Sequence, residues 1–388
     1  MRIYLDHNAT TPVASSVADA VDDVVRSCFG NASSVHTFGQ AAKALLDEAR
    51  ASVATLIGAQ PAEIVFTGSG TEADNLAIRG VAEALTPATR PHLIASAIEH
   101  EAVLNTLKAL SKREWTTTLL PVGSSGVVDP TDLEAAMTKE TALVSVMHAN
   151  NEIGTVQPVT ELAVIAHSQG ALFHTDAVQT AGKHPIDVNT LGIDLLSISG
   201  HKFNGPKGVG ALWVRRGARL VANLTGGRQE RNRRAGTENI PAIAGLGVAA
   251  RLAATKLHGE AARLGALRDR LETGILDAVP DSAVNGTTGR VPNTTNVSFD
   301  GVEAEALLIA LDLEGIAVST GSACSSGTLE PSHVLRAMGF TPHRAQNSIR
   351  FSLGLGNTDD HVTRTIKIIP RVVAKLRQLS RSGPHLRS

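Results

Sequence analysis

The stretch LLSISGHKFNGPKGVGALWV, residues 195–214, holds the pattern that decides the fold. Its first five residues, 195–199, predict a buried strand that runs into a turn rich in glycine and proline, and GVGALWV at 208–214 predicts the next strand. Lys202 lies in the turn, at the carboxyl end of the first strand, where α/β folds bind their ligands. A partly desolvated lysine there loses its proton readily and attacks aldehydes. For the His201–Lys202 pair on its own, an ordinary surface lysine is the alternative.

Short apolar segments alternate with amphipathic ones on the N-terminal side of this stretch, from about residue 40 onward. Strands are expected at 63–68, 92–97, 141–149 and 171–177. Helices are expected at 39–57, 71–85, 101–112 and 159–169. Buried strands that alternate with helices predict a mostly parallel sheet covered on both faces. The sequence therefore predicts an α/β fold whose large domain spans residues 13–250.

The character of the sequence changes after about residue 250. Leucines at helical spacing predict a long connecting helix, which ends near Ile275. Strands are expected at 296–301, 316–320 and 348–353, and helices at 303–312 and 358–380. Pro370 should kink or split the last helix. Residues 1–12 and 251–388 are expected to form a smaller α+β domain.

Composition excludes several classes of function. The 36 lysines and arginines nearly balance the 37 aspartates and glutamates, so no overall field favours nucleic acid or an anionic membrane. The N-terminal residues lack the features of a signal peptide, and no apolar run approaches the roughly 20 residues that span a bilayer. Two cysteines are too few for a disulfide framework or a zinc site. We expect a cytoplasmic protein with free thiols and no metal.

Other polar residues also follow expected strands. Asp176 could hold a pyridinium nitrogen protonated, with Gln179 nearby, although a lone aspartate there is more often a helix N-cap. Gly70 and Thr71, in GSGTEADN, form a strand-to-helix turn that could cradle a phosphate, a weak signal by itself. His100 could stack on a flat ring, relay a proton or cap a helix, and Asn151 offers a hydrogen-bond donor. Their joint placement at strand ends favours a single ligand site.

With these residues assembled, the chain resembles the cysteine desulfurases of the NifS/IscS type. These are class V aminotransferase relatives that depend on pyridoxal 5'-phosphate (PLP) and share the fold type I architecture. The resemblance runs from end to end, and its motifs stand in the family's order: YLDHNATTP, GNASSVH, GSGTEADN, EHEAV, NNEIG, HTDAVQ, SGHKFNGPKG, GGRQE, RAGTEN, TGSACSSG, LEPSHVLRAMG and SIRFSLG.

The resemblance implies roles for the residues around the cofactor. Lys202 would join the PLP aldehyde in a Schiff base, and Asp176 would pair with the pyridine nitrogen. Gln179 would contact the ring hydroxyl, and His100 would stack on the ring. A further set would hold the phosphate, its last member coming from the second subunit of a homodimer: Gly70, Thr71, Ser199, His201 and Thr237.

The resemblance also implies how substrate is bound. Arg350 would clamp the carboxylate of L-cysteine, a bidentate task that lysine performs poorly. Asn151 would touch cofactor and substrate, and Asn31 is a second candidate contact. Two departures from the family pattern, His7 and Arg228, are expected at the rim of the site.

Cys324 aligns with the family's nucleophilic cysteine. It would attack the substrate sulfur as a thiolate and leave as a persulfide, with alanine as the other product. Glycine and serine around it, in residues 319–333, predict a mobile loop that carries the thiol between the site and the surface. A passive small residue in a surface loop is the alternative. Cys28 is expected to be structural or incidental.

The resemblance leaves the partner and the finer activity open. The sulfur acceptor could be an iron–sulfur scaffold protein or an enzyme of tRNA or DNA thiolation, including DNA phosphorothioation. A selenocysteine lyase, an aminotransferase of the same class and a non-catalytic scaffold are the competing functions. Retention of Lys202, Asp176, His100, Arg350 and Cys324 argues against the scaffold.

Overall fold

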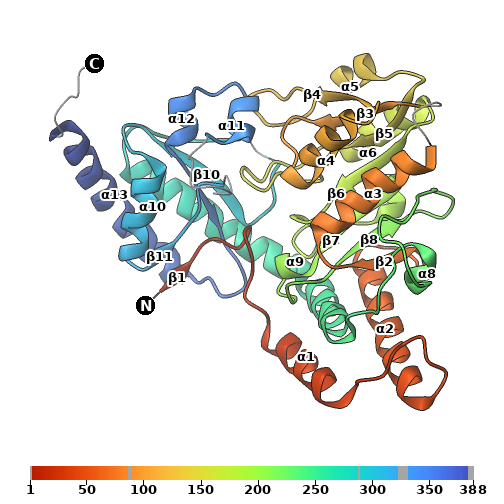
Figure 1. Ribbon diagram of the computed structural model, residues 1–388. Coiled ribbons are helices and arrows are strands. Elements are labelled where there is room, and N and C mark those ends of the chain that lie inside the picture. Colours follow the sequence, from red (N-terminus) through yellow and green to blue (C-terminus); the bar gives the residue numbers. More distant parts are fainter. Residues whose placement is uncertain (1, 86–89, 287–288, 322–330, 383–388) are drawn as a thin grey trace.

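The structure, a computed structural model, describes residues 2–85, 90–286, 289–321 and 331–382. A seven-stranded sheet lies at its centre, in the order β2-β8-β7-β6-β5-β3-β4 (Figure 1). Strands β3 to β7 pair in parallel, whereas β8 is antiparallel to both β7 and β2. This mixed, mostly parallel sheet confirms the α/β class. The strand bounds are β2 (Ile64–Thr67), β3 (His92–Ser96), β4 (Thr116–Leu120), β5 (Thr141–Ser145), β6 (Leu172–Asp176), β7 (Leu195–Ser199) and β8 (Gly210–Val214).

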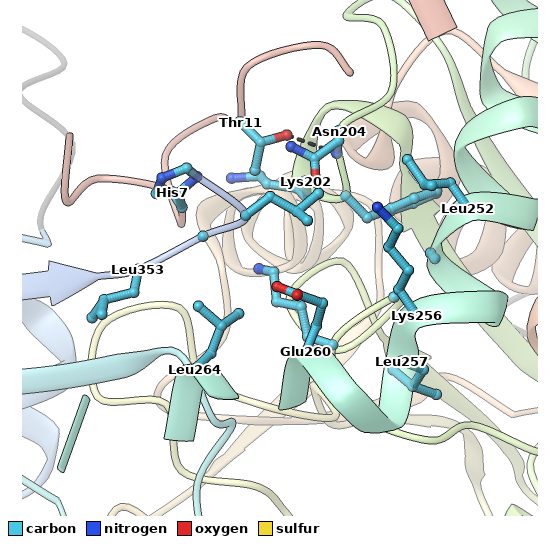
Figure 2. A pocket seen from close by; sticks show the side chains of 16 residues that line it. His7, Thr11, Lys202, Asn204, Leu252, Lys256, Leu257, Glu260, Leu264 and Leu353 are labelled. Atoms are coloured by element: carbon cyan, nitrogen blue, oxygen red, sulfur yellow. Dashed lines mark hydrogen bonds between the residues drawn. The ribbon is translucent and has the colours of Figure 1, made fainter. Parts of the chain in front are cut away.

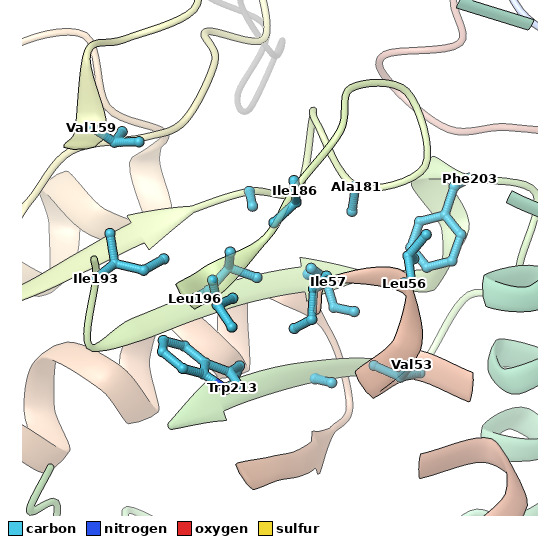
Figure 3. Packing of buried hydrophobic residues seen from close by; sticks show 14 of the residues in the cluster. Val53, Leu56, Ile57, Val159, Ala181, Ile186, Ile193, Leu196, Phe203 and Trp213 are labelled. Atoms are coloured by element: carbon cyan, nitrogen blue, oxygen red, sulfur yellow. The ribbon is translucent and has the colours of Figure 1, made fainter. Parts of the chain in front are cut away.

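Successive strand residues point to opposite faces of this sheet. Because apolar side chains lie on both faces, helices cover both of them. On one face, Leu196 and Trp213 belong to the same buried cluster as Val53 of α2, and Figure 3 shows side chains of this cluster. Leu195 and Leu212 pack on the other face with α3 and α4. The helices of this part are α1 (Ser15–Ser27), α2 (Thr37–Leu56), α3 (Gly70–Leu85), α4 (Glu101–Ser111), α5 (Pro130–Ala136), α6 (Val159–Ser168), α7 (Val188–Leu191) and α8 (Gln229–Asn232).

A smaller sheet and its helices form the second part of the molecule. Strand β10 (Thr294–Phe299) pairs antiparallel with β12 (Ser348–Ser352) and β9 (Ser282–Val284). The N-terminal β1 (Ile3–Tyr4) pairs in parallel with β11 (Ile316–Ala317), so the first residues of the chain belong to this part. Its helices are α10 (Ala304–Leu313), α11 (His333–Ala337), α12 (Pro342–Gln346) and α13 (Asp359–Ser382), the last of which continues through Pro370 rather than splitting there.

One long helix, α9 (Ile240–Ala278), joins the two parts (Figure 1). Leu246 near its start lies in the core of the large sheet, and Leu271 near its end lies in the core of the smaller part. Among the described residues, α9 is the helix long and apolar enough to cross a membrane, but half of its most apolar window is buried inside the protein. It packs against α1, α2 and α13, as a core helix does. The predicted boundary at residue 250 falls within α9, and the division stays a prediction.

Candidate active site

A cavity of about 190 Å³ opens where β6 and β7 end and α3 begins. This is the edge at which parallel α/β sheets bind ligands, because the carboxyl ends of their strands meet there. The cavity is also lined by Ser69, Asp74, Met147 and Val178. It brings together nine of the predicted site residues: Gly70, Thr71, His100, Asn151, Asp176, Gln179, Ser199, His201 and Lys202.

One end of the cavity is built to receive an anion. Gly70 is the first residue of α3, whose N-terminal N–H groups and helix dipole favour negative charge. A Cβ atom on Gly70 would lie 2.7 Å from Val178 Cγ2 and 3.2 Å from Ser199 Cβ, so glycine lets the turn approach the strand end closely. Burial and neighbouring lysine charges lower the pKa of His201 to about 4, which leaves a neutral imidazole at this end.

The floor of the cavity holds two buried carboxyl groups. Asp176 is 6% exposed, and its Oδ1 accepts a hydrogen bond of 2.8 Å from the Val178 N–H. Asp74 is 1% exposed, and its Oδ1 has no hydrogen-bond partner among the described residues. Burial raises the pKa of both, and the Asp176 charge raises that of Asp74 further. The charges of His100 and Lys202 act in the opposite direction on the pKa of Asp176, so Asp176 is the carboxyl group of the pair that more readily carries the negative charge.

Lys202 stands at the wall of the cavity. Its Nζ donates to the backbone oxygens of Asn8, at 2.5 Å, and Ala9, at 3.0 Å. Burial and the Arg350 charge lower the pKa of Lys202 to about 8, although Asp176 and Asp6 act in the opposite direction. A substantial fraction of the amine is therefore neutral near pH 8, the form that attacks a carbonyl carbon.

This pKa gives a measurable pH dependence. The rate at which the apoprotein captures an aldehyde on Lys202 should rise with pH and level off near pH 8, because only the neutral amine reacts. An unperturbed lysine would keep gaining rate up to about its ordinary pKa of 10.5. Stopped-flow absorbance after mixing apoprotein with PLP measures this rate. A rate that still rises tenfold per unit above pH 9 would contradict the assignment of a depressed pKa.

Lys202 also borders a second, smaller cavity of about 50 Å³ on its far side, where Figure 2 shows it with His7, Lys256 and Glu260. Lys183 lines the same cavity, and its Nζ donates to Gln179 Oε1 at 3.2 Å. Burial and the charges of Lys202 and Arg350 lower the pKa of Lys183 to about 7. His7, expected at the rim, is instead 3% exposed inside the protein. Lys183 therefore orients the Gln179 amide from behind the site.

His100 and Asn151 connect the cavity to neighbouring elements. His100 is the N-cap of α4, and its Nδ1 accepts a hydrogen bond of 3.1 Å from the Ala102 N–H. His100 also lines the cavity, so it can cap the helix and contact a ligand at the same time. The Asn151 carbonyl accepts hydrogen bonds from Asn8 Nδ2 at 3.0 Å and Arg350 Nη1 at 3.1 Å.

Arg350 lies behind Asn151 rather than in the cavity wall. It is 3% exposed, and its Nη2 donates to Asp6 Oδ1 at 2.6 Å. Its buried Nε has no hydrogen-bond partner among the described residues. Asp6, from the N-terminal segment, therefore fixes the direction of the guanidinium.

Besides Arg350, the predicted residues Asn31, Thr237 and Cys324 are not among the described residues that line this cavity. Asn31 is exposed between α1 and α2, and Thr237 is exposed just before α9. Cys324 lies outside the described residues, as does most of its expected loop. Cys28, expected to be structural or incidental, packs partly buried against the large core.

Sequence reasoning missed Asp74, Asn8, Asp6 and Lys183. Asp74 stands in the GSGTEADN motif, and its place on the apolar face of a predicted helix was the available signal. Asn8 and Asp6 lie within YLDHNATTP, and Lys183 closely follows HTDAVQ. Their roles depend on contacts between distant segments, since Asn8 and Lys202 are 194 residues apart.

The chain is similar in sequence and in structure to known proteins of one family. Residues 3–365 match the family model described as aminotransferase class-V. The chain is 48% identical over 379 residues to a cysteine desulfurase IscS from Dictyoglomus turgidum, covering 97% of this chain and 96% of that protein. A solved structure of a NifS-like protein superposes with a TM-score of 0.91 at 38% identity, covering 97% of this chain and all of the other. A structure of SspA in complex with cysteine superposes with a TM-score of 0.81 at 36% identity, covering 91% and 99%.

Proposed function

We propose that this chain, which belongs to the class V aminotransferase family and, within it, to the cysteine desulfurases of the NifS/IscS type, converts L-cysteine to L-alanine and passes the sulfur to Cys324 as a persulfide. The observation that carries the proposal is the placement of Lys202, an amine with a lowered pKa, in one cavity with the buried carboxylate of Asp176.

The cavity fits PLP, on which this family depends. Its anion-favouring end at α3 suits a phosphate, and the buried carboxyl group of Asp176 could pair with a protonated pyridine nitrogen. The lowered pKa of Lys202 suits an aldehyde partner. We assign Lys202 as the attachment point, Asp176 as the ring-nitrogen partner, Gln179 as the contact to the ring hydroxyl and His100 as the stacking side chain. Phosphate binding falls to Gly70, Thr71, Ser199 and His201, with Thr237 supplied by a second copy.

When bound, PLP supplies an electron sink for the carbon that loses its proton. Lys202 is the group placed to remove that proton from the substrate Cα. It lines the cavity, and its lowered pKa leaves part of the amine neutral and able to accept a proton. Asp176 holds the compensating negative charge beneath the site. Asn151 and Arg350 hold the substrate in position, and Arg350 is itself fixed by Asp6.

Sulfur transfer falls to Cys324. Its thiolate attacks the substrate sulfur, the Cβ–S bond breaks, and a new S–S bond forms on Cys324. The bonding electrons stay on the three-carbon fragment, which takes up protons and leaves as alanine. The two sulfurs are oxidised and Cβ is reduced, so the step balances without an outside oxidant.

The persulfide requires an acceptor, for which an iron–sulfur scaffold or a thiolation enzyme has suitable chemistry. We expect the reaction in the cytoplasm, where thiols stay reduced. We also propose a homodimer, because Thr237 is exposed and outside its own chain's cavity, as a residue that serves a second copy would be.

Analysis of the products tests the proposed function. The PLP-loaded protein, given L-cysteine and a reducing thiol, should release alanine and sulfide in equal amounts without forming a 2-oxo acid. Formation of a 2-oxo acid instead would identify an aminotransferase. A rate far higher with selenocysteine than with cysteine would identify a selenocysteine lyase.

Arg350 gives a prediction specific to substrate binding. Arg350→Lys keeps the charge but loses the planar pair of donors, so we expect kcat/KM for L-cysteine to fall about ten- to hundredfold, the worth of one hydrogen bond to a charged group. The loss should appear chiefly in KM, with the PLP absorbance unchanged. Arg270→Lys, which alters an exposed pair with Asp359, is the matched control. An unchanged KM in Arg350→Lys would rule out this carboxylate clamp.

A further inference from the structure

Glu152 is a buried carboxyl group to which the proposed reaction gives no task. It is 1% exposed and directly follows Asn151, which lines the cavity. Its backbone is fixed on both sides, since its N–H donates to Asn150 Oδ1 at 2.8 Å and its carbonyl accepts from Asn296 Nδ2 at 3.3 Å. These two hydrogen bonds hold the backbone of Glu152 in place, and with it the base of the side chain.

The side chain of Glu152 meets both flanks of the segment that holds Cys324. On the C-terminal flank, Ser332 Oγ donates to Glu152 Oε2 at 2.5 Å, and both side chains are buried. On the N-terminal flank, Gly321 lies so close that a Cβ atom on it would be 3.0 Å from the same oxygen. Residues 322–330 lie outside the described residues, and Glu152 is close to a described residue on each side of them.

Both flanks are held by further bonds. Gly321 has a φ of +88°, a left-handed conformation that favours glycine, and its N–H donates to Ser319 Oγ at 3.1 Å. Ser332 caps α11 by accepting from the Leu335 N–H at 3.1 Å. An alanine at Gly321 would be strained and would press on Glu152 as well. The backbone at position 321 therefore favours glycine, and the contacts at position 332 require a hydroxyl group.

Two charged side chains act on Glu152: His333, which follows Ser332, and Arg350, the proposed substrate contact. Burial raises the pKa of Glu152, while the charges of His333 and Arg350 act in the opposite direction and favour the carboxylate. Arg350 is the proposed carboxylate clamp, and its Nη1 bonds to the carbonyl of Asn151, next to Glu152. One short segment, residues 151–152, therefore faces both the substrate contact and the flanks.

We propose that Glu152 is a positioning residue that fixes both flanks of the 322–330 segment against the active site and so sets the rate at which Cys324 meets the substrate sulfur. The inference rests on the proposed function. It assigns Glu152 no contact with substrate or cofactor. Its effect should therefore be confined to the step that forms the persulfide.

A single-turnover experiment with matched variants tests this role. PLP-loaded wild type, Glu152→Ala, Glu152→Gln and an exposed control, Glu161→Ala, are mixed with one equivalent of L-cysteine. Persulfide on Cys324 is followed by mass spectrometry, and cofactor absorbance and cysteine affinity are measured beside it. We expect Glu152→Ala to slow persulfide formation about tenfold with absorbance and affinity unchanged, since one hydrogen bond to a charged group is lost. Glu152→Gln, which keeps an oxygen acceptor for Ser332, should stay within about threefold of wild type.

Variants of Ser332, on the C-terminal flank, provide a second and independent test. Ser332→Ala should slow the same step and Ser332→Thr, which keeps the hydroxyl, should restore it. Adding Ser332→Ala to Glu152→Ala should slow the step by less than Ser332→Ala does in the wild-type protein, because the contact between the two side chains is already lost.

Three results would overturn the inference: wild-type persulfide rates in Glu152→Ala, a loss of cofactor absorbance in Glu152→Gln, or additive effects in the double variant. Should Glu152→Ala fail to fold, the comparison of Ser332→Ala with Ser332→Thr decides the matter. If wild type itself forms no persulfide on Cys324, the proposed function fails instead, so the two failures are distinguishable.

Discussion

Replacing Lys202 with alanine is expected to lower alanine formation by at least about a factor of 10³. Two contributions are lost together. The variant has no amine to attach the cofactor covalently, and it has no base placed to remove the substrate Cα proton. Positioned general bases alone contribute about 10² to 10⁴. Lys183 also has a lowered pKa, but it lines the second cavity and not the site, so we do not expect it to take over the task.

The matched control is Lys207→Ala, which removes an exposed lysine from the same glycine-rich turn. It should keep wild-type activity and absorbance. Added small primary amines should restore part of the lost rate in Lys202→Ala if the missing group is a base. Alanine formation within tenfold of wild type in Lys202→Ala would contradict the assignment.

Replacing Cys324 with alanine is expected to abolish persulfide formation while PLP binding stays intact. The variant loses the sulfur nucleophile and nothing in the described cavity, whose lining residues all come from other segments. The visible absorbance of bound PLP should therefore match that of wild type, and L-cysteine should still perturb it. Release of sulfide or transfer of sulfur to an acceptor should fall to the background set by free PLP with cysteine.

Cys28→Ala is the control for this variant, since Cys28 packs partly buried against the large core and does not line the cavity. It should retain transfer in full. Undiminished sulfide release from Cys324→Ala would show that another group accepts the sulfur, and the proposed mechanism would then be wrong.

Much of the large sheet was predictable because its strands are buried on both faces. Segments such as 195–199 and 171–177 therefore appear as apolar runs, and they lie close to β7 and β6. Strand β4 was missed, since its TTTLL sequence lies partly exposed at the edge of the sheet and gives no apolar run. Pro370 was expected to kink or split its helix, and α13 continues past it without splitting.

The candidate site was predictable where its residues follow strands directly, as Asp176 and Lys202 do. It was not predictable where a distant segment supplies the contact. Asn8 reaches Lys202 only after the N-terminal segment crosses the fold, and no periodicity marks that crossing. Lys183 resembles any surface lysine in sequence, and only the tertiary structure buries it beside Gln179. Residues such as Thr237, assigned to a second copy, depend on an assembly that one chain does not contain.

The most direct test of the central claim follows the sulfur atom itself. PLP-loaded protein is mixed with one equivalent of L-cysteine labelled with a heavy sulfur isotope, quenched with an alkylating agent and digested for mass spectrometry. We expect one labelled persulfide on Cys324 for each alanine formed, with Cys28 unmodified. Alanine formed while Cys324 carries no labelled sulfur, or label found on Cys28 instead, would contradict it.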